Sequence, residues 1–436
     1  MLTGISEVEI TPKVGVDLQG FAVRPQPSQS VGDSLMVRAL YLQNENEQPI
    51  LWLVFDLLGL MEPITQEIRT KIESELLIPA SRIMISSTHT HSGPGVTHLF
   101  RCGNYCSDYA AQLPEKAFQA ALRAINNRES CRTFFIEASS SLGRDRHTGP
   151  ERKTDFRIPV LFWEKMDGSN EIKAVLTSYS MHPVCLKDNI ISADWPGEVS
   201  RQLCQSLPGH PITLVCSGAC GNIDPPQCGV SYNQMISWGQ EIAQSILQPL
   251  TLSRQNHENS EIHEIKTPFL FQRHEFQAST YDQTKEDVIE FVRRTLEDGS
   301  GTRSFGEIYR FAATDWQKKM FQQIEKGTIS TVPIRYCLLK FDHLAFVSVN
   351  VEMFCHLTQL IEQQREASKA EIASSFSNQK TYVIGNGDFA VGYLGVRSAY
   401  EAHSYEVDES CLFYGRPRFK IGTLEELANA IAEKLE

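Results

Sequence analysis

Apolar residues along the chain recur in two patterns, and each pattern predicts one kind of element. Short runs of aliphatic and β-branched residues bounded by turn residues are typical of strands, whereas apolar positions spaced three and four residues apart predict amphipathic helices. The predicted strands fall at 7–10, 37–42, 50–56, 82–86, 175–181, 212–216 and 344–351, and the predicted helices at 64–77, 107–127, 285–296, 313–324 and 424–435. The alternation of strands and helices favours an α/β fold, with a mixed β-sheet core flanked by helices.

Two histidines follow the predicted strand at 82–86. His89 and His91 stand two residues apart in the segment 88–94, which closes with a Gly-Pro turn. Residues i and i+2 of a strand share one side, so both imidazoles are expected to face one cleft. Neutral imidazole is a common ligand of transition metals. The alternative is a pair of loop histidines that hydrogen-bond neighbouring backbone.

Three later strands also end in polar groups. The strand at 175–181 leads to His182, the strand at 212–216 to a glycine-rich loop with Asp224, and the strand at 344–351 to Glu352. Ligand sites of open α/β sheets form beyond the carboxyl ends of strands. A carboxylate in a stretch as apolar as that around Glu352 costs on the order of several kcal/mol unless it is paired or bound to metal. His182 and Glu352 are therefore candidate metal ligands.

Composition excludes some classes of function. The chain has 436 residues, of which 41% are hydrophobic and 22% charged, and its formal net charge of −12 argues against nucleic acid as a partner. No apolar run is long enough for a membrane span. The first residues lack the features of a secretory leader, which predicts a cytoplasmic protein, although a secreted mature form would look the same. The 11 cysteines lack the spacing of structural zinc sites and are interpreted as mostly reduced thiols.

The domain organisation is predicted to be simple. Residues 1–436 are interpreted as a single metallohydrolase domain without internal repeats or linkers. Within it, residues 252–330 surround two predicted helices with polar and charged stretches, which indicates a helical insertion or lid.

Five motifs, in their order along the chain, resemble the neutral/alkaline (non-lysosomal) ceramidase family. They are the segments 8–22, 88–94, 181–183, 218–225 and 392–406. The resemblance covers the catalytic domain of the family from end to end and implies its fold. The chain stops before the immunoglobulin-like C-terminal domain that usually follows in the family, a domain that helps such enzymes work on membrane lipid.

The resemblance implies a zinc ion held by His89, His182, Glu352 and Tyr393. Two imidazoles and a carboxylate are a sensible catalytic set, because three strong protein ligands leave room for water. Tyr393 would be a weak or switchable fourth ligand, and its alternative is a buried tyrosine with a hydrogen-bonded hydroxyl. Iron or manganese also suits such a set.

The resemblance further implies four catalytic residues. His91 would orient substrate or stabilise charge on the carbonyl oxygen, or else be a structural loop histidine. Arg146 resembles a substrate-binding arginine, although Arg144 fits nearly as well and a surface arginine is the alternative. Tyr400 would add a hydroxyl to the cleft or simply pack. Asp224 stands where the family has serine, and it would act as general base, bind a substrate amine, or hydrogen-bond its own turn.

These features favour a zinc-dependent amidohydrolase acting on a small-molecule N-acyl or lipid-like, ceramide-type compound. Zinc lowers the pKa of bound water towards about 7 and polarises the scissile carbonyl. One alternative is an amide- or lactam-forming enzyme, or an esterase, on a small polar substrate in a specialised bacterial pathway. Another is a non-catalytic member that binds a ligand, against which the intact His89, His182 and Glu352 argue. The sequence leaves the oligomeric state open.

Overall fold

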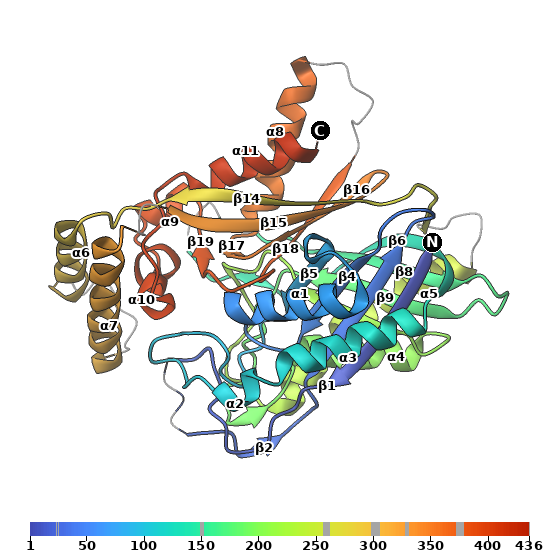
Figure 1. Ribbon diagram of the computed structural model, residues 1–436, viewed down its shortest axis with the longest axis horizontal. Coiled ribbons are helices and arrows are strands. Elements are labelled where there is room, and N and C mark those ends of the chain that lie inside the picture. Colours follow the sequence, from blue (N-terminus) through green and yellow to red (C-terminus); the bar gives the residue numbers. More distant parts are fainter. Residues whose placement is uncertain are drawn as a thin grey trace.

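A nine-stranded mixed sheet forms the larger part of the fold (Figure 1). The computed structural model describes residues 1–22, 24, 26–148, 152–255, 262–297, 306–327, 331–371 and 379–435. The strands of this first sheet are β1 (Leu2–Glu9), β3 (Met36–Gln43), β4 (Ile50–Phe55), β5 (Ile83–Ser87), β6 (Glu129–Ser139), β8 (Arg157–Lys165), β9 (Ile172–Tyr179), β11 (Ile212–Ser217) and β13 (His263–Ile265). Their order is β11-β9-β8-β6-β1-β3-β4-β5, with β13 paired to β6. The pairs β4/β5 and β11/β9 are parallel, so the sheet is mixed as predicted.

A second, four-stranded sheet packs on the first. Its strands are β14 (Leu270–Ser279), β15 (Thr331–Phe341), β16 (Leu344–Val349) and β18 (Lys380–Ile384), in that order. Three two-stranded pairs complete the strands: β2 (Ser30–Val31) with β10 (Ile190–Ile191), β7 (Arg144–Asp145) with β12 (Ile223–Asp224), and β17 (Glu352–Met353) with β19 (Tyr393–Leu394).

Helices cover the outer face of each sheet, which gives four layers (Figure 1). The first sheet is covered by α1 (Glu62–Leu76), α3 (Leu113–Asn126), α4 (Asp194–Ser206) and α5 (Tyr232–Gln255), and the second by α8 (His356–Glu371) and α11 (Thr423–Leu435). The remaining helical segments are η1 (Ala80–Arg82), α2 (Ser107–Ala110), α6 (Lys285–Glu297), α7 (Gly306–Glu325), α9 (Arg397–Glu401), the π-helix η2 (Tyr405–Glu409) and α10 (Ser410–Tyr414). None of the helices in the described ranges combines the length and apolar character that a bilayer span requires.

Strand β4 shows why the layers form. Leu53 points into the cluster shared with α1 and α3, whereas Trp52 and Val54 point into the cluster between the two sheets. A strand that is buried on both faces needs apolar residues at every position, which β4 has. The prediction of an α/β fold with a mixed sheet flanked by helices is confirmed.

The segment 252–330 is more than a helical insertion. Its two predicted helices are present as α6 and α7, but β14 in the same segment pairs with β15 along its whole length. The prediction missed β14 because its exposed edge carries polar residues such as Gln272 and Glu275, which mask the strand pattern.

The loops after several strands meet at one place. Ile384, the last residue of β18, forms a bridge with Gly218, which follows β11, and Gly387 in the loop after β18 forms a bridge with Ser86 in β5. A side chain at Gly387 would lie 2.4 Å from the hydroxyl of Ser348, so only glycine permits this close crossing. The carboxyl ends of strands from both sheets therefore converge, and the candidate site lies where they do.

Candidate metal centre

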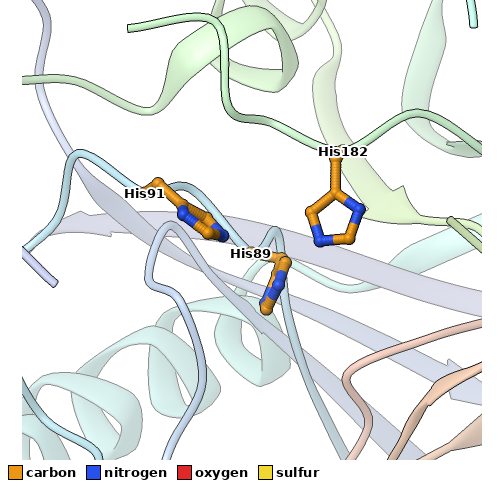
Figure 2. A group of neighbouring side chains, drawn as sticks. All are labelled: His89, His91 and His182. Atoms are coloured by element: carbon orange, nitrogen blue, oxygen red, sulfur yellow. The ribbon is translucent and has the colours of Figure 1, made fainter. Parts of the chain in front are cut away.

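Three histidines gather around one small region of the interior (Figure 2). His89 and His91 follow β5, and His182 follows β9. The ring centroid of His89 lies 5.1 Å from that of His91 and 5.0 Å from that of His182. One ring nitrogen from each histidine lies within 4.8 Å of the others. The structure thus joins residues that are about ninety positions apart in the sequence.

The backbone at His89 differs from the strand geometry that the sequence suggested. Strand β5 ends at Ser87, and His89 has a φ of 68°, in the left-handed region that non-glycine residues seldom adopt. Alternation along a strand is therefore not what turns the two rings towards one cleft. The His89 amide donates to the carbonyl of Leu57 (2.9 Å), which holds the turn. Such strain is characteristic of functional sites.

Hydrogen bonds fix the tautomers of His89 and His182. Nδ1 of His89 donates to the carbonyl of Leu58 (2.6 Å), and Nδ1 of His182 donates to the carbonyl of Cys220 (2.7 Å). Because a carbonyl can only accept, each Nδ1 carries a proton, and the neutral ring presents a lone pair at Nε2.

Both of these Nε2 atoms face the same oxygen of Glu352. The distances to Oε2 are 3.0 Å from His89 and 3.2 Å from His182. Two imidazole lone pairs and a carboxylate oxygen repel one another unless a proton or a metal cation lies among them. Backbone carbonyls that orient a histidine through its other nitrogen are also the usual second layer of a metal site. The arrangement could hold a metal ion.

Glu352 is buried, and none of the described lysines and arginines forms an ion pair with it. Its side chain is 2% exposed, and in the described part of the chain its ion pairs are with the two histidines. Burial alone would raise the pKa of Glu352, but positive charge and hydrogen bonds from His89 and His182 outweigh it and hold this pKa well below its ordinary value, and a cation bound among the three groups would act in the same direction. The second oxygen accepts a hydrogen bond from the Tyr414 hydroxyl. The carboxylate is thus ionised and oriented.

Tyr393 lies at the edge of the same cluster. The parallel pairing of β17 and β19 places it directly beside Glu352. Its hydroxyl lies 3.3 Å from Nε2 of His182, and the two rings are stacked. Tyr393 is therefore within reach of a cation held by the histidines. Tyr414 was not among the predicted site residues, because nothing in its short helix α10 distinguishes it from a packing tyrosine.

His91 is packed but has unused nitrogens. Both its ring nitrogens are buried, and neither has a hydrogen-bond partner among the residues that the structure describes. The Phe21 ring meets it edge-on at 5.1 Å, and a side chain at Gly20 would lie 2.4 Å from Nδ1. Burial, together with the neighbouring His89 and His182, holds the pKa of His91 well below its ordinary value. A neutral His91 is therefore free to hydrogen-bond a ligand.

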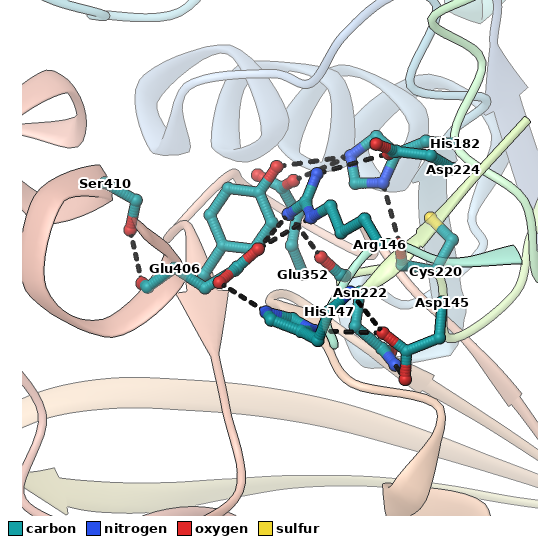
Figure 3. Close-up of polar contacts among 12 residues, drawn as sticks. Asp145, Arg146, His147, His182, Cys220, Asn222, Asp224, Glu352, Glu406 and Ser410 are labelled. Atoms are coloured by element: carbon teal, nitrogen blue, oxygen red, sulfur yellow. Dashed lines mark hydrogen bonds and ion pairs between the residues drawn. The ribbon is translucent and has the colours of Figure 1, made fainter. Parts of the chain in front are cut away.

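Arg146 extends the site on the side of Tyr393 (Figure 3). Its Nε donates to Glu406 (2.6 Å), and its Nη1 donates to Asp224 (3.2 Å). The guanidinium carbon lies 5.4 Å from the centre of the Tyr393 ring. Arg144, the other arginine that fitted the motif, is exposed. Of the two arginines, the structure brings Arg146 to the cluster.

Asp224 and Tyr400, the two remaining predicted residues, lie in different surroundings. Asp224 lies in β12 with a side chain that is 24% exposed, and it is paired with Arg146. Tyr400 lies in α9 and packs against the hydrophobic cluster that contains Leu394 and Ala399. The ion pair with Arg146 thus places Asp224 beside the histidine cluster, whereas Tyr400 lies in a neighbouring apolar layer.

A buried chain of charges continues from Arg146 (Figure 3). The side chain of Glu406 is fully buried and also accepts from Nε2 of His147 (3.0 Å). Nδ1 of His147 lies 3.0 Å from Asp145. The hydrogen bonds to Asp145 and Glu406, working against burial, raise the pKa of His147 to about 9. His147 and Glu406 were not among the predicted site residues, because their pairing joins distant segments.

We predict that His147 makes stability depend on pH. Its folded-state pKa of about 9 lies above the ordinary value of about 6.5. Its contribution is therefore complete below about pH 6.5 and is lost as the pH rises through 9, by about 3 kcal/mol in all. Urea unfolding of the wild type between pH 6 and pH 9.5 should show this loss, and His147→Gln should flatten it.

The matched control for this prediction is His403→Gln. His403 also pairs with an acid, Asp408, but its side chain is 59% exposed. This variant should keep the slope of the wild type. A His147→Gln variant with the same slope as the wild type would contradict the assignment.

The described residues thus form a four-layered α/β protein with a buried cluster of histidines, carboxylate and tyrosines. No protein-family model matches the chain, and no curated protein sequence matches it. Solved structures, in contrast, do match the chain. One, described as a ceramidase complexed with C2, has a TM-score of 0.73 and 14% identity over 99% of this chain and 75% of that one. The neutral ceramidase from Pseudomonas aeruginosa has a TM-score of 0.70 and 15% identity over 99% of this chain and 74% of that one. The chain has the fold of these ceramidases, which confirms the predicted resemblance at the level of fold.

Proposed function

We propose that this protein is a zinc-dependent hydrolase of the amide bond in an N-acyl compound. The observation that carries the proposal is the pair of Nε2 lone pairs on His89 and His182 that face one oxygen of Glu352. That arrangement, on the fold of proteins described as ceramidases, supports metal-assisted amide hydrolysis.

The donors fit a zinc ion. His89, His182 and Glu352 would hold it, with Tyr393 as the fourth ligand, and this mixture of nitrogen and oxygen donors suits zinc. When bound, zinc would supply a water of lowered pKa and would polarise the scissile carbonyl.

The chain's own residues would bind and orient the amide. Neutral His91, with two unpartnered nitrogens, would hydrogen-bond the carbonyl oxygen and stabilise the charge that develops there. Arg146 is held by Glu406, so its charge is fixed in place beside Tyr393. Oδ1 of Asp224 accepts from Arg146, and within the described ranges Oδ2 accepts no hydrogen bond. That free oxygen would take up a proton from the attacking water.

We expect Asp224→Asn to lower kcat about 100-fold, because an amide cannot accept this proton. Its metal content should match that of the wild type, since Asp224 is paired with Arg146 and is not one of the proposed ligands. Initial rates and plasma mass spectrometry on the same preparations test both expectations. Asp167→Asn, in an exposed acid of the turn between β8 and β9, is the control. A rise in KM alone would instead assign Asp224 to binding a substrate amine.

A screen of N-acyl amines of several chain lengths tests the proposed function. Release of free carboxylic acid should stop with a zinc chelator and return when zinc is restored. Intact amides across the screen would contradict the proposal. The amide- or lactam-forming alternative and the esterase alternative would use the same groups, and no feature of the geometry favours either.

The segment 252–330 is proposed to belong to the same single domain. Trp316 of α7 donates its indole hydrogen to the carbonyl of Arg416 (2.6 Å), and it packs in one cluster with Phe413 of α10. Because α10 also carries Tyr414, these helices support the layer that orients Glu352.

A further inference from the structure

A cluster of positive charge lies beside His91. The ring of Phe21, which meets His91 edge-on, also contacts two cations. The guanidinium carbon of Arg24 lies 5.2 Å from the centre of this ring, and Nζ of Lys187 lies 5.7 Å from it. Two positive charges thus flank an aromatic ring that touches the histidine cluster.

Neither cation is neutralised by a salt bridge. Within the described ranges, neither Arg24 nor Lys187 has a carboxylate oxygen within 4.0 Å. Nη2 of Arg24 donates to the carbonyl of Leu186 (3.2 Å), but its buried Nε and Nη1 have no partner in the described part of the chain. Unpaired donors on a charged, buried group are costly, so they indicate a ligand that the protein meets in use.

The nearest acids act on Arg24 only at longer range. Burial lowers the pKa of Arg24 to about 10, and the attraction of Asp188 and Asp194 opposes this effect. Asp188 is exposed to solvent. Asp194 is buried and accepts hydrogen bonds from the backbone amides of Cys185 and Trp195. Neither acid therefore serves as a counterion for the free donors.

Arg24 also lines a cavity of about 570 Å³. This volume is typical of small-molecule sites. The other charges in its lining have partners, because Arg101 pairs with Asp315 (2.9 Å) and Asp17 accepts from Asn104 (3.2 Å). The lining is mostly polar, which suits the polar amine half of an N-acyl substrate better than its hydrocarbon chain.

We propose that Phe21, Arg24 and Lys187 form an anion-binding subsite for the amine half of the substrate, which carries a carboxylate or a phosphate. This inference rests on the proposed amide hydrolysis and narrows its substrate class to acidic N-acyl compounds. The planar, permanently charged guanidinium presents its free donors to an oxyanion, and Lys187 adds a point charge at the solvent side. A neutral N-acyl alcohol would leave the Arg24 donors unpaired.

Three substrates that differ at one group test the proposal. They are N-octanoylglycine, the O-phosphate of N-octanoylethanolamine, and neutral N-octanoylethanolamine. The wild type should hydrolyse at least one of the two anions with a kcat/KM at least about 10-fold above that of the neutral amide. The better anion identifies the group as carboxylate or phosphate.

Arg24→Gln should lower kcat/KM for the preferred anion by about 10- to 100-fold, chiefly through KM. It should leave the neutral amide within about 3-fold of the wild type. Arg123→Gln is the matched control, because Arg123 is an exposed arginine of α3 that does not line this cavity. A wild type that prefers the neutral amide, or an Arg24→Gln variant that loses both substrates equally, would overturn the proposal.

Calorimetric binding of N-octanoylglycine and of the phosphate separates this proposal from the proposed function. Binding of an anion that Arg24→Gln weakens, without any hydrolysis, would support the subsite and contradict the hydrolase. Hydrolysis of neutral amides with no anion preference would support the hydrolase and overturn the subsite. Neither binding nor hydrolysis of any of the three compounds would overturn both.

Discussion

Replacing Glu352 with alanine should remove the metal and the amide hydrolysis together. The carboxylate is the group that His89 and His182 share, and without it two imidazoles and a tyrosine remain. We expect about one zinc per chain in the wild type and less than about a tenth of that in Glu352→Ala, because catalytic zinc needs three firm ligands. Loss of a residue that only supports a metal ligand costs up to about 100-fold in activity. Loss of the ligand itself should lower activity by more than this. Plasma mass spectrometry and initial rates on the same preparations measure both.

Tyr414→Phe is the matched control for this variant. It removes the hydroxyl that donates to the second oxygen of Glu352 but leaves the ligand itself. We expect an intermediate result, with metal affinity or activity reduced by about 10- to 100-fold. A wild type that stays free of metal after incubation with zinc would contradict the hydrolase proposal. A Glu352→Ala variant that retains its zinc would remove Glu352 from the ligand set.

The sequence could predict which residues stand at strand ends, because a buried strand must be apolar and a polar residue after it is conspicuous. His182 and Glu352 follow the apolar strands β9 and β16, and both reach the cluster. His89 also reaches it, although its left-handed backbone, which a strand pattern cannot reveal, decides where its ring points. Only the family motifs indicated which of these residues act together as ligands, because spacing along the chain does not show this.

Long-range pairs could not be predicted in this way. Glu406 accepts from Arg146, 260 positions away in the sequence, and from its neighbour His147. Glu406 lies in the stretch 404–410, whose polar residues conceal that its side chain is fully buried. The same limit explains why Arg144 and Arg146 were indistinguishable, since only the contacts of Arg146 with Glu406 and Asp224 show which side chain faces inward. Local pattern predicts elements, whereas the partner of a buried charge depends on tertiary structure.

Glu406→Gln should cause a large loss of stability. Glu406 is the buried counterion of both Arg146 and His147, and a neutral amide of the same shape would leave two cations facing each other across it. Removing one partner of a buried ion pair lowers the free energy of unfolding by about 3 to 5 kcal/mol, because the remaining charge is left uncompensated. We therefore expect the free energy of unfolding to fall by about 3 kcal/mol at pH 7. Urea unfolding should show a lower midpoint with an unchanged slope.

Glu401→Gln, in an exposed acid of the adjacent helix α9, should leave the midpoint where it is. The double variant His147→Gln/Glu406→Gln separates the pair from the rest of the network. Removing His147 also removes one of the two cations that lose their counterion. The sum of the stability losses of the two single variants should therefore exceed the stability loss of the double variant. Additive losses would show that Glu406 and His147 act independently. A Glu406→Gln variant as stable as the wild type would mean that Arg146 finds its counterion in Asp224 alone, and Glu406 would then have no part in holding Arg146 beside Tyr393.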